Sequence, residues 1–224
     1  MNIIKLSVIL ASLLFASCPG YPVRRTLNPL ETYEAVQESV PYIITDHKNS
    51  DEPLPEWVSK WLEGGIKEAQ SLDAFEDRLV FISENKGSNF NALGLWNNGF
   101  SLEQDFPRLA AARIKERFIS STPFPDEMYG SFFIHLIRAA SDAPWTGAVR
   151  EDDFWIRRKY LPTEDEVPEE AREEWVFLIL VTMEKSLFAS QLDAVFRSVN
   201  PSPRPSREQT NAVNRIRDRF LDDF

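Results

Sequence analysis

The sequence predicts an α+β domain in which a few strands are packed by several helices, flanked by an N-terminal tether and a C-terminal helix. Two short apolar runs, 79–82 and 175–181, have the length and residue types of strands. Around them, apolar residues recur every three or four positions, which is the spacing of helices with one buried face. A hydrophobic content of 43% with six tryptophans is enough to build a core.

Residues 1–17 have the layout of a secretory signal peptide. Lys5 supplies a positive charge, an apolar stretch runs from Leu6 to Phe15, and the small residues Ala16 and Ser17 precede Cys18. The stretch is shorter than the roughly 20 residues that a membrane span needs. We therefore expect cleavage before Cys18.

Cys18 is the only cysteine of the chain. Small residues before a cysteine resemble the lipobox of bacterial lipoproteins, although Phe15 stands where the lipobox usually has an aliphatic residue. The resemblance implies that Cys18 carries lipid and anchors the protein in the bacterial cell envelope, at the outer rather than the inner membrane. The alternative is an ordinary secretory signal followed by a free thiol, since a lone cysteine forms no intramolecular disulfide.

Residues 18–52 are expected to be the tether, because prolines punctuate them, and residues 40–44 are expected to add a short edge strand. The domain is predicted over 53–199. It opens with a helix that places Trp57 and Trp61 on one face and is interrupted or ended by Gly64-Gly65. The strand at 79–82 follows, and then a turn at 86–89 that also offers a helix cap.

A helix is predicted from Phe90 to about Gly99, and a second one begins with Asp105 as its N-cap and Pro107 in its first turn. The apolar face of the second helix repeats every four residues, at Phe106, Ala110, Ile114 and Phe118. A strongly amphipathic helix is expected over 128–140.

The second half of the domain contains two further strands. Residues 154–160 are predicted as a half-exposed strand in which Arg158 interrupts the apolar face, and 163–174 as an acidic loop. Residues 175–181 are apolar throughout, which indicates a central strand covered on both faces. Ser186 is expected to cap the last helix of the domain, which continues to Val199.

The C-terminal region, 200–224, is predicted to be a proline-rich linker followed by an amphipathic helix. Residues 206–209 have the spacing of a capping box. Val213, Ile216 and Phe220 form a narrow apolar stripe, which we identify as a candidate partner-binding surface. Because a short helix on a linker gains little stability alone, the stripe should dock either on its own domain or on a partner.

The chain has 35 acidic and 25 basic residues, a net charge of −10. This excess argues against nucleic acid as a partner and against electrostatic attraction to anionic lipid. The one dense basic cluster of the domain is Arg157-Arg158-Lys159. This cluster either contacts lipid headgroups or an anionic polymer, or forms ion pairs with the acidic loop. We favour the ion pairs.

Neither histidine has metal-ligand spacing. We expect His135 to be packed or half-buried in its helix and His47 to lie in a polar loop. We expect no metal, no cofactor and no catalytic residues. The pairs Asp152-Asp153 and Glu173-Glu174 could serve as glycosidase carboxylates, but a solvated face is the simpler interpretation. The tryptophans are expected in the core rather than stacked on sugars, with Trp155 as the exception.

Several segments resemble the outer-membrane family of twenty-kilodalton lipoproteins. They are Pro55-Glu56-Trp57, 79–82, 106–118, Asp153-Phe154-Trp155 and 175–181. The resemblance, over roughly 53–199, implies a small mainly antiparallel sheet packed by helices, and it carries over no catalytic residue. The helix at 128–140 and the long acidic loop depart from the family pattern.

The sequence therefore predicts a membrane-anchored, noncatalytic envelope lipoprotein that binds or scaffolds other envelope components. The alternatives are an envelope hydrolase acting on cell-wall glycan or peptide, and a lipoprotein that binds a small ligand. A hydrolase needs two carboxylates facing each other across about 5–10 Å. A small-ligand binder needs a concave pocket lined by tryptophans.

Overall fold

A computed structural model describes residues 41–121, 127–161, 172–199, 211 and 214. For 118–121 and 127–131 it describes the backbone only. The chain divides into two units, Met1–Ser39 and Val40–Phe224, and every described residue belongs to the second unit. None of the helices in these ranges combines the length and the hydrophobicity of a membrane span.

The second unit is built on a four-stranded antiparallel sheet. Its strands are β1 (Tyr42–His47), β2 (Arg78–Gly87), β3 (Val149–Tyr160) and β4 (Glu173–Glu184), in the order β1-β3-β4-β2. β4 lies between β3 and β2, so the predicted central strand is confirmed. The predicted α+β class, with a small antiparallel sheet packed by helices, is also confirmed.

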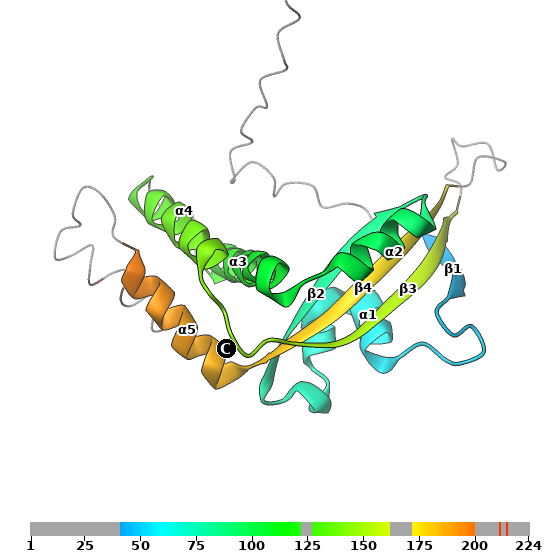
Figure 1. Ribbon diagram of the computed structural model, residues 1–224, viewed down its shortest axis with the longest axis horizontal. Coiled ribbons are helices and arrows are strands. Elements are labelled where there is room, and N and C mark those ends of the chain that lie inside the picture. The colour runs from blue at the N-terminus through cyan, green and yellow to red at the C-terminus, as the bar shows by residue number, and fades with distance from the viewer. Residues whose placement is uncertain (1–40, 122–126, 162–171, 200–210, 212–213, 215–224) are drawn as a thin grey trace, which may run out of the picture. The chain divides into compact units, whose positions relative to one another are not determined.

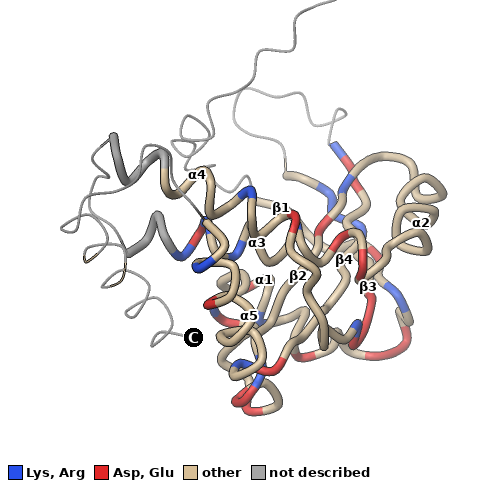
Figure 2. The backbone as a smooth tube through the Cα atoms, turned by 60° about the vertical axis from the view of Figure 1, so that its left-hand side comes forward, with Lys and Arg blue, Asp and Glu red and all other residues tan. Residues whose placement is uncertain are grey.

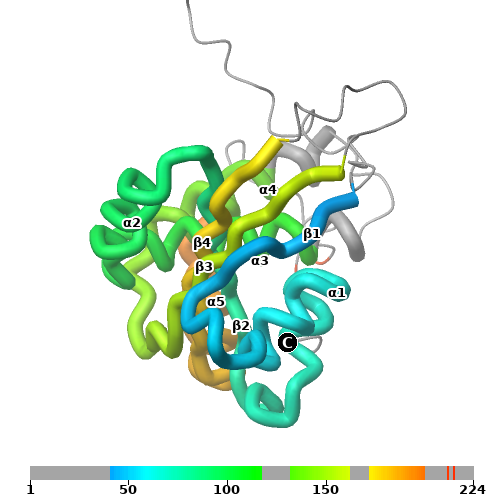
Figure 3. The backbone as a smooth tube through the Cα atoms, turned by 90° about the vertical axis from the view of Figure 1, so that its right-hand side faces the viewer, coloured from blue at the N-terminus to red at the C-terminus, as the bar shows by residue number. Residues whose placement is uncertain are grey.

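Within the described ranges up to residue 199, five α-helices surround the sheet: α1 (Glu56–Gln70), α2 (Phe90–Gly99), α3 (Leu102–Ser121), α4 (Glu127–Asp142) and α5 (Lys185–Ser198). A single 3₁₀ turn, Asp73–Phe75, precedes β2. Helix α1 packs on one face of the sheet, and α3, α4 and α5 pack on the other (Figures 1 and 3). Acidic and basic positions are interspersed along the described backbone (Figure 2).

The alternation of side chains along β4 explains why both faces of the sheet are covered. Val176, Leu178 and Leu180 lie in the cluster that contains Trp57 and Val58 of α1. Ile179, Val181 and Met183 lie in the larger cluster beneath α3, α4 and α5, which also includes Phe81, Phe106, Phe188 and Leu192. The unbroken apolar run of β4 therefore contributes side chains to two separate cores, one on each face of the sheet.

Several local predictions are confirmed. Gly64 and Gly65 have non-helical backbone angles and kink α1, and Gly65 has a φ of 70°. Glycine suits that position because it carries no Cβ to clash at positive φ. Asn89 caps α2, since its side chain accepts a hydrogen bond from the Ala92 N–H at 3.1 Å. β1 is an edge strand that pairs with β3, so the sheet includes part of the stretch expected to be tether.

Other local predictions are wrong at the ends of elements. Strand β2 continues to Gly87, through half of the predicted turn, because its pairing with β4 extends to Trp175. Helix α3 begins at Leu102, so Pro107 lies beyond the first turn. Asp105 instead accepts a hydrogen bond from the Ser101 N–H at 2.8 Å. Helix α5 begins one residue before Ser186, which makes no cap.

Candidate functional site

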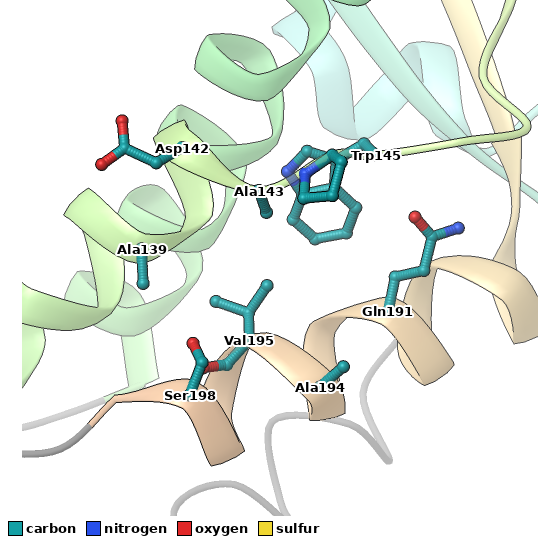
Figure 4. A pocket seen from close by; sticks show the side chains of 9 residues that line it. Ala139, Asp142, Ala143, Trp145, Gln191, Ala194, Val195 and Ser198 are labelled. Atoms are coloured by element: carbon teal, nitrogen blue, oxygen red, sulfur yellow. The ribbon is translucent and has the colours of Figure 1, made fainter.

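A pocket of about 430 Å³ lies between the C-terminal half of α4 and the outer side of α5 (Figure 4). Helix α4 contributes Ala139 and Asp142, and the chain that follows contributes Trp145. Helix α5 contributes Ala194 and Val195. The remaining lining residues are Ala143, Pro144, Gln191 and Ser198.

The small side chains of the two helices create the pocket. Ala139, Ala143 and Ala194 extend no further than Cβ, so the space between the helices is left unfilled above the core. Beneath it, Leu136, Ala140 and Leu192 are fully buried and hold the helices against the sheet. The pocket is therefore a depression on top of a packed core.

Two side chains with polar groups hold in place the part of the pocket wall that is formed by the segment connecting α4 to β3. The Trp145 Nε1–H donates to the Ala140 carbonyl at 2.8 Å, while its ring stacks on Phe188 at 5.0 Å between centroids. The Gln191 side chain accepts from the Thr146 N–H and donates to the Thr146 carbonyl, both at 2.9 Å. These contacts preform the pocket wall.

The remaining polar groups leave the pocket mainly apolar in character. The Ser198 hydroxyl donates to the Val195 carbonyl at 2.7 Å, so it is already engaged. Asp142 is exposed at the rim and has no ion-pair or hydrogen-bond partner among the described residues. The pocket can bury an apolar group and place one carboxylate beside it.

The structure separates Asp152 and Asp153. Asp152 accepts a hydrogen bond from Trp57 Nε1–H of α1 at 3.0 Å, and it lies opposite Leu180 of the α1 core. Asp153 lies opposite Ile179 of the other core and forms ion pairs with Lys48 at 2.9 Å and Arg150 at 3.1 Å. These two carboxylates point to opposite faces of the sheet and do not face each other across a cleft.

Glu173 and Glu174 also have partners. Glu173 forms an ion pair with Arg157. The buried Glu174 accepts hydrogen bonds from the Tyr160 hydroxyl and from Arg172. Burial alone would raise the pKa of Glu174, but the hydrogen bonds from Tyr160 and Arg172 outweigh it and lower that pKa. Burial and the Glu174 carboxylate raise the pKa of Tyr160.

The basic cluster is divided between the two faces. Arg157 forms its ion pair with Glu173 and lies over the Trp175 ring at 5.2 Å. Arg158 is buried between the rings of Tyr42, at 4.5 Å, and Trp61, at 5.5 Å. Lys159 lies opposite Glu173 in the β3–β4 register. The cluster therefore forms no continuous basic surface on β3.

The two histidines lie apart and differ in burial. His47 belongs to strand β1, so the prediction that it lies in a loop is wrong. It is half-buried, with Nδ1 3.0 Å from the Lys48 carbonyl oxygen and its ring stacked on Phe154. His135 is exposed on α4, so the prediction that it packs in the helix is wrong: the buried face of α4 is formed by Phe132, Phe133, Leu136 and Ala140. In the ranges that the structure covers, no group of histidine, cysteine and acidic side chains could hold a metal ion.

Of the six tryptophans, Trp57 is buried and the other five are half-buried. Trp155 and Trp175 are half-buried and pack edge to face with each other and with Phe90. Because these rings meet at steep angles, between 68° and 88°, they form no flat platform for a sugar.

Cys18 and the stripe of Val213, Ile216 and Phe220 lie outside the described residues. Sequence reasoning missed the α4–α5 pocket. Its only sequence signal is the set of alanines on the outer sides of two amphipathic helices, and nothing in the sequence says that those sides meet.

Comparison with known proteins gives no match to a protein-family model, a curated protein or a solved structure. The resemblance to the twenty-kilodalton lipoproteins remains a prediction from the sequence.

Proposed function

We propose that this chain is a noncatalytic lipoprotein of the bacterial cell envelope that binds another envelope protein through the α4–α5 pocket. The observation that carries the proposal is the pocket itself, which is preformed and apolar, with its Trp145, Gln191 and Ser198 polar groups already engaged. The anchor is the lipid predicted on Cys18.

A protein partner suits this pocket because interfaces are commonly centred on one or two apolar anchors that fill a well-packed depression. The alanines let an incoming helix or loop approach closely, and Asp142 at the rim favours a basic residue beside the anchor. The paired acids of β3 and β4 take structural roles in this proposal, as partners of Trp57, Lys48, Arg157 and Tyr160.

A small apolar ligand is the second candidate, favoured by Trp145 on the pocket wall. The volume of about 430 Å³ lies within the range of about 300–1,000 Å³ that small-molecule pockets occupy. A hydrolase would need a pair of carboxylates other than Asp152 and Asp153, and no observation among the described residues favours one.

The anchor is tested by metabolic labelling with a clickable fatty acid. The natural chain should be labelled and should sediment with membranes, whereas Cys18→Ala should lose the label and be released. An unlabelled natural chain would reduce the proposal to an exported protein without a lipid.

The binding surface is tested by a photo-crosslinking amino acid placed at Ala143 in the pocket, with Leu95 as the matched control. Leu95 is 75% exposed on α2 and lines no part of the pocket. A discrete protein adduct should form from position 143 only, and Ala194→Phe should abolish it by filling the pocket. Identical adducts from both positions would contradict the proposal, and a small-molecule adduct would favour the second candidate.

A further inference from the structure

We propose that the C-terminal segment of this same chain, residues 206–224, occupies the α4–α5 pocket with Val213, Ile216 and Phe220. The inference takes from the proposed function only that the pocket is a binding surface. It adds a regulatory property, because a segment held in the pocket competes with the envelope partner.

The linker after α5 is long enough for the segment to reach the pocket. Helix α5 ends at Ser198, which itself lines the pocket, and the segment begins only a few residues later. The intervening residues 200–205 contain three prolines, and at about 3.1 Å per residue they can span up to about 20 Å. This length is sufficient for the chain to reverse direction and return along α5.

The apolar stripe matches the α5 wall of the pocket in length. From Val213 to Phe220 the stripe extends over seven helical steps, or about 10 Å. The wall that α5 contributes runs from Gln191 to Ser198, which is the same number of steps. A helix lying antiparallel to α5 would place the stripe along the full length of the pocket.

The two described residues of the segment have the exposure that docking of the stripe requires. Asn211 and Asn214 are the two described residues of the segment, and both are helical and exposed. At 100° per residue, Asn211 lies about 170° and Asn214 about 130° from the centre of the stripe. The exposed positions are therefore on the side that docking of the stripe would leave in solvent.

The charges beside the stripe complement the charge at the pocket rim. On the same helical projection, Arg217 and Arg219 flank the stripe on its two sides, at about 70° and about 90° from its centre. The exposed Asp142 at the pocket rim has no partner within the described part of the chain. A docked segment would bring an arginine toward this carboxylate.

Disulfide trapping tests the docking directly. In the full chain carrying Cys18→Ser, cysteines are introduced at Ala194 in the pocket and Ile216 in the stripe. The matched control pairs Ala194→Cys with Asn211→Cys, on the opposite side of the segment. Because a disulfide requires Cα atoms within about 7 Å, only the first pair should form an intramolecular bond under mild oxidation at low protein concentration.

No bond in the first pair, or equal bonding in both pairs, would overturn the inference. An intermolecular bond would also overturn it, because the occupant would then be a second copy of the chain. Phe220→Asp provides an independent measurement: by releasing the segment it should increase the partner adduct from position 143 several-fold. If the segment is trapped but no partner adduct forms even from the released Phe220→Asp chain, the proposed function is refuted and this inference stands.

Discussion

The two faces of the sheet are held by different kinds of contact. On the α1 face, one helix is fixed by directional polar contacts: Trp57 Nε1–H donates to Asp152 at 3.0 Å, and Gln70 bonds to the Arg78 carbonyl and the Val80 N–H, both at 2.8 Å. On the face covered by α3, α4 and α5, aromatic rings meet in the core, with Phe81 4.9 Å from Phe106 and 5.6 Å from Phe188.

The difference follows from the number of helices on each face. A single helix buries less apolar area than three, so specific hydrogen bonds and a stacked arginine supplement the packing on the α1 face. Three helices must also pack against one another, and small residues between α4 and α5 leave the pocket. The pocket is consequently on the face whose stability depends on packing.

Phe188→Ala should have the largest effect, because Phe188 is fully buried between Phe81 and Trp145. Removing a core phenylalanine costs about 3–5 kcal/mol. Urea denaturation followed by circular dichroism measures the change, with the exposed Leu95→Ala, expected within about 0.5 kcal/mol, as the control. Similar losses for the two variants would contradict the location of the core.

Arg158→Ala should be next, at about 2 kcal/mol, since the substitution removes a buried guanidinium stacked on Tyr42 and Trp61. Its neighbour Arg157 forms an exposed ion pair, and Arg157→Ala should cost less than about 1 kcal/mol. The free energies of unfolding of Arg158→Ala and Arg157→Ala are measured and compared. Arg158→Lys should recover only part of the loss, because an ammonium lacks the planar face that stacks on the rings.

Tyr160→Phe should cost about 1 kcal/mol at pH 7 by removing the hydrogen bond to Glu174. The folded protein lowers the pKa of Glu174, so this contribution is present above about pH 4.3 and is lost as the pH falls through the lowered value. Folding raises the pKa of Tyr160. The stability that Tyr160 contributes is therefore present below about pH 10, and it is lost as the pH rises through the raised pKa.

Unfolding free energies measured from pH 3 to pH 11 test this prediction. The difference between the natural chain and Tyr160→Phe should be largest between those limits and should narrow toward both. A constant difference across the range would show that Tyr160 acts through packing alone.

Ala194→Leu should have the smallest effect on stability, within about 0.5 kcal/mol, because Ala194 is exposed on α5. The same substitution should reduce crosslinking from position 143 by narrowing the pocket. A large loss of stability would mean that the site belongs to the core of the helical face.

Much of the fold could be predicted from the sequence because apolar spacing reports burial directly. The run 175–181 required a strand covered on both faces, and Gly64-Gly65 required a break in α1. The ends of elements were less predictable. Pairing with β4 extends β2 through a turn-like sequence, and Ser101 with Asp105 starts α3 earlier than Asp105 alone would.

The sequence by itself determined the fold class, the central strand, and the expectation of lipid at Cys18, because each depends on residue types and spacing along the chain. Only the tertiary structure decided the partners of these side chains: Arg157 pairs with Glu173, Arg158 stacks on Tyr42 and Trp61, and Asp152 and Asp153 bind Trp57 and Lys48. It also decided that the alanines of α4 and α5 line one pocket. These are contacts between distant segments, and they follow from how the helices pack across the sheet.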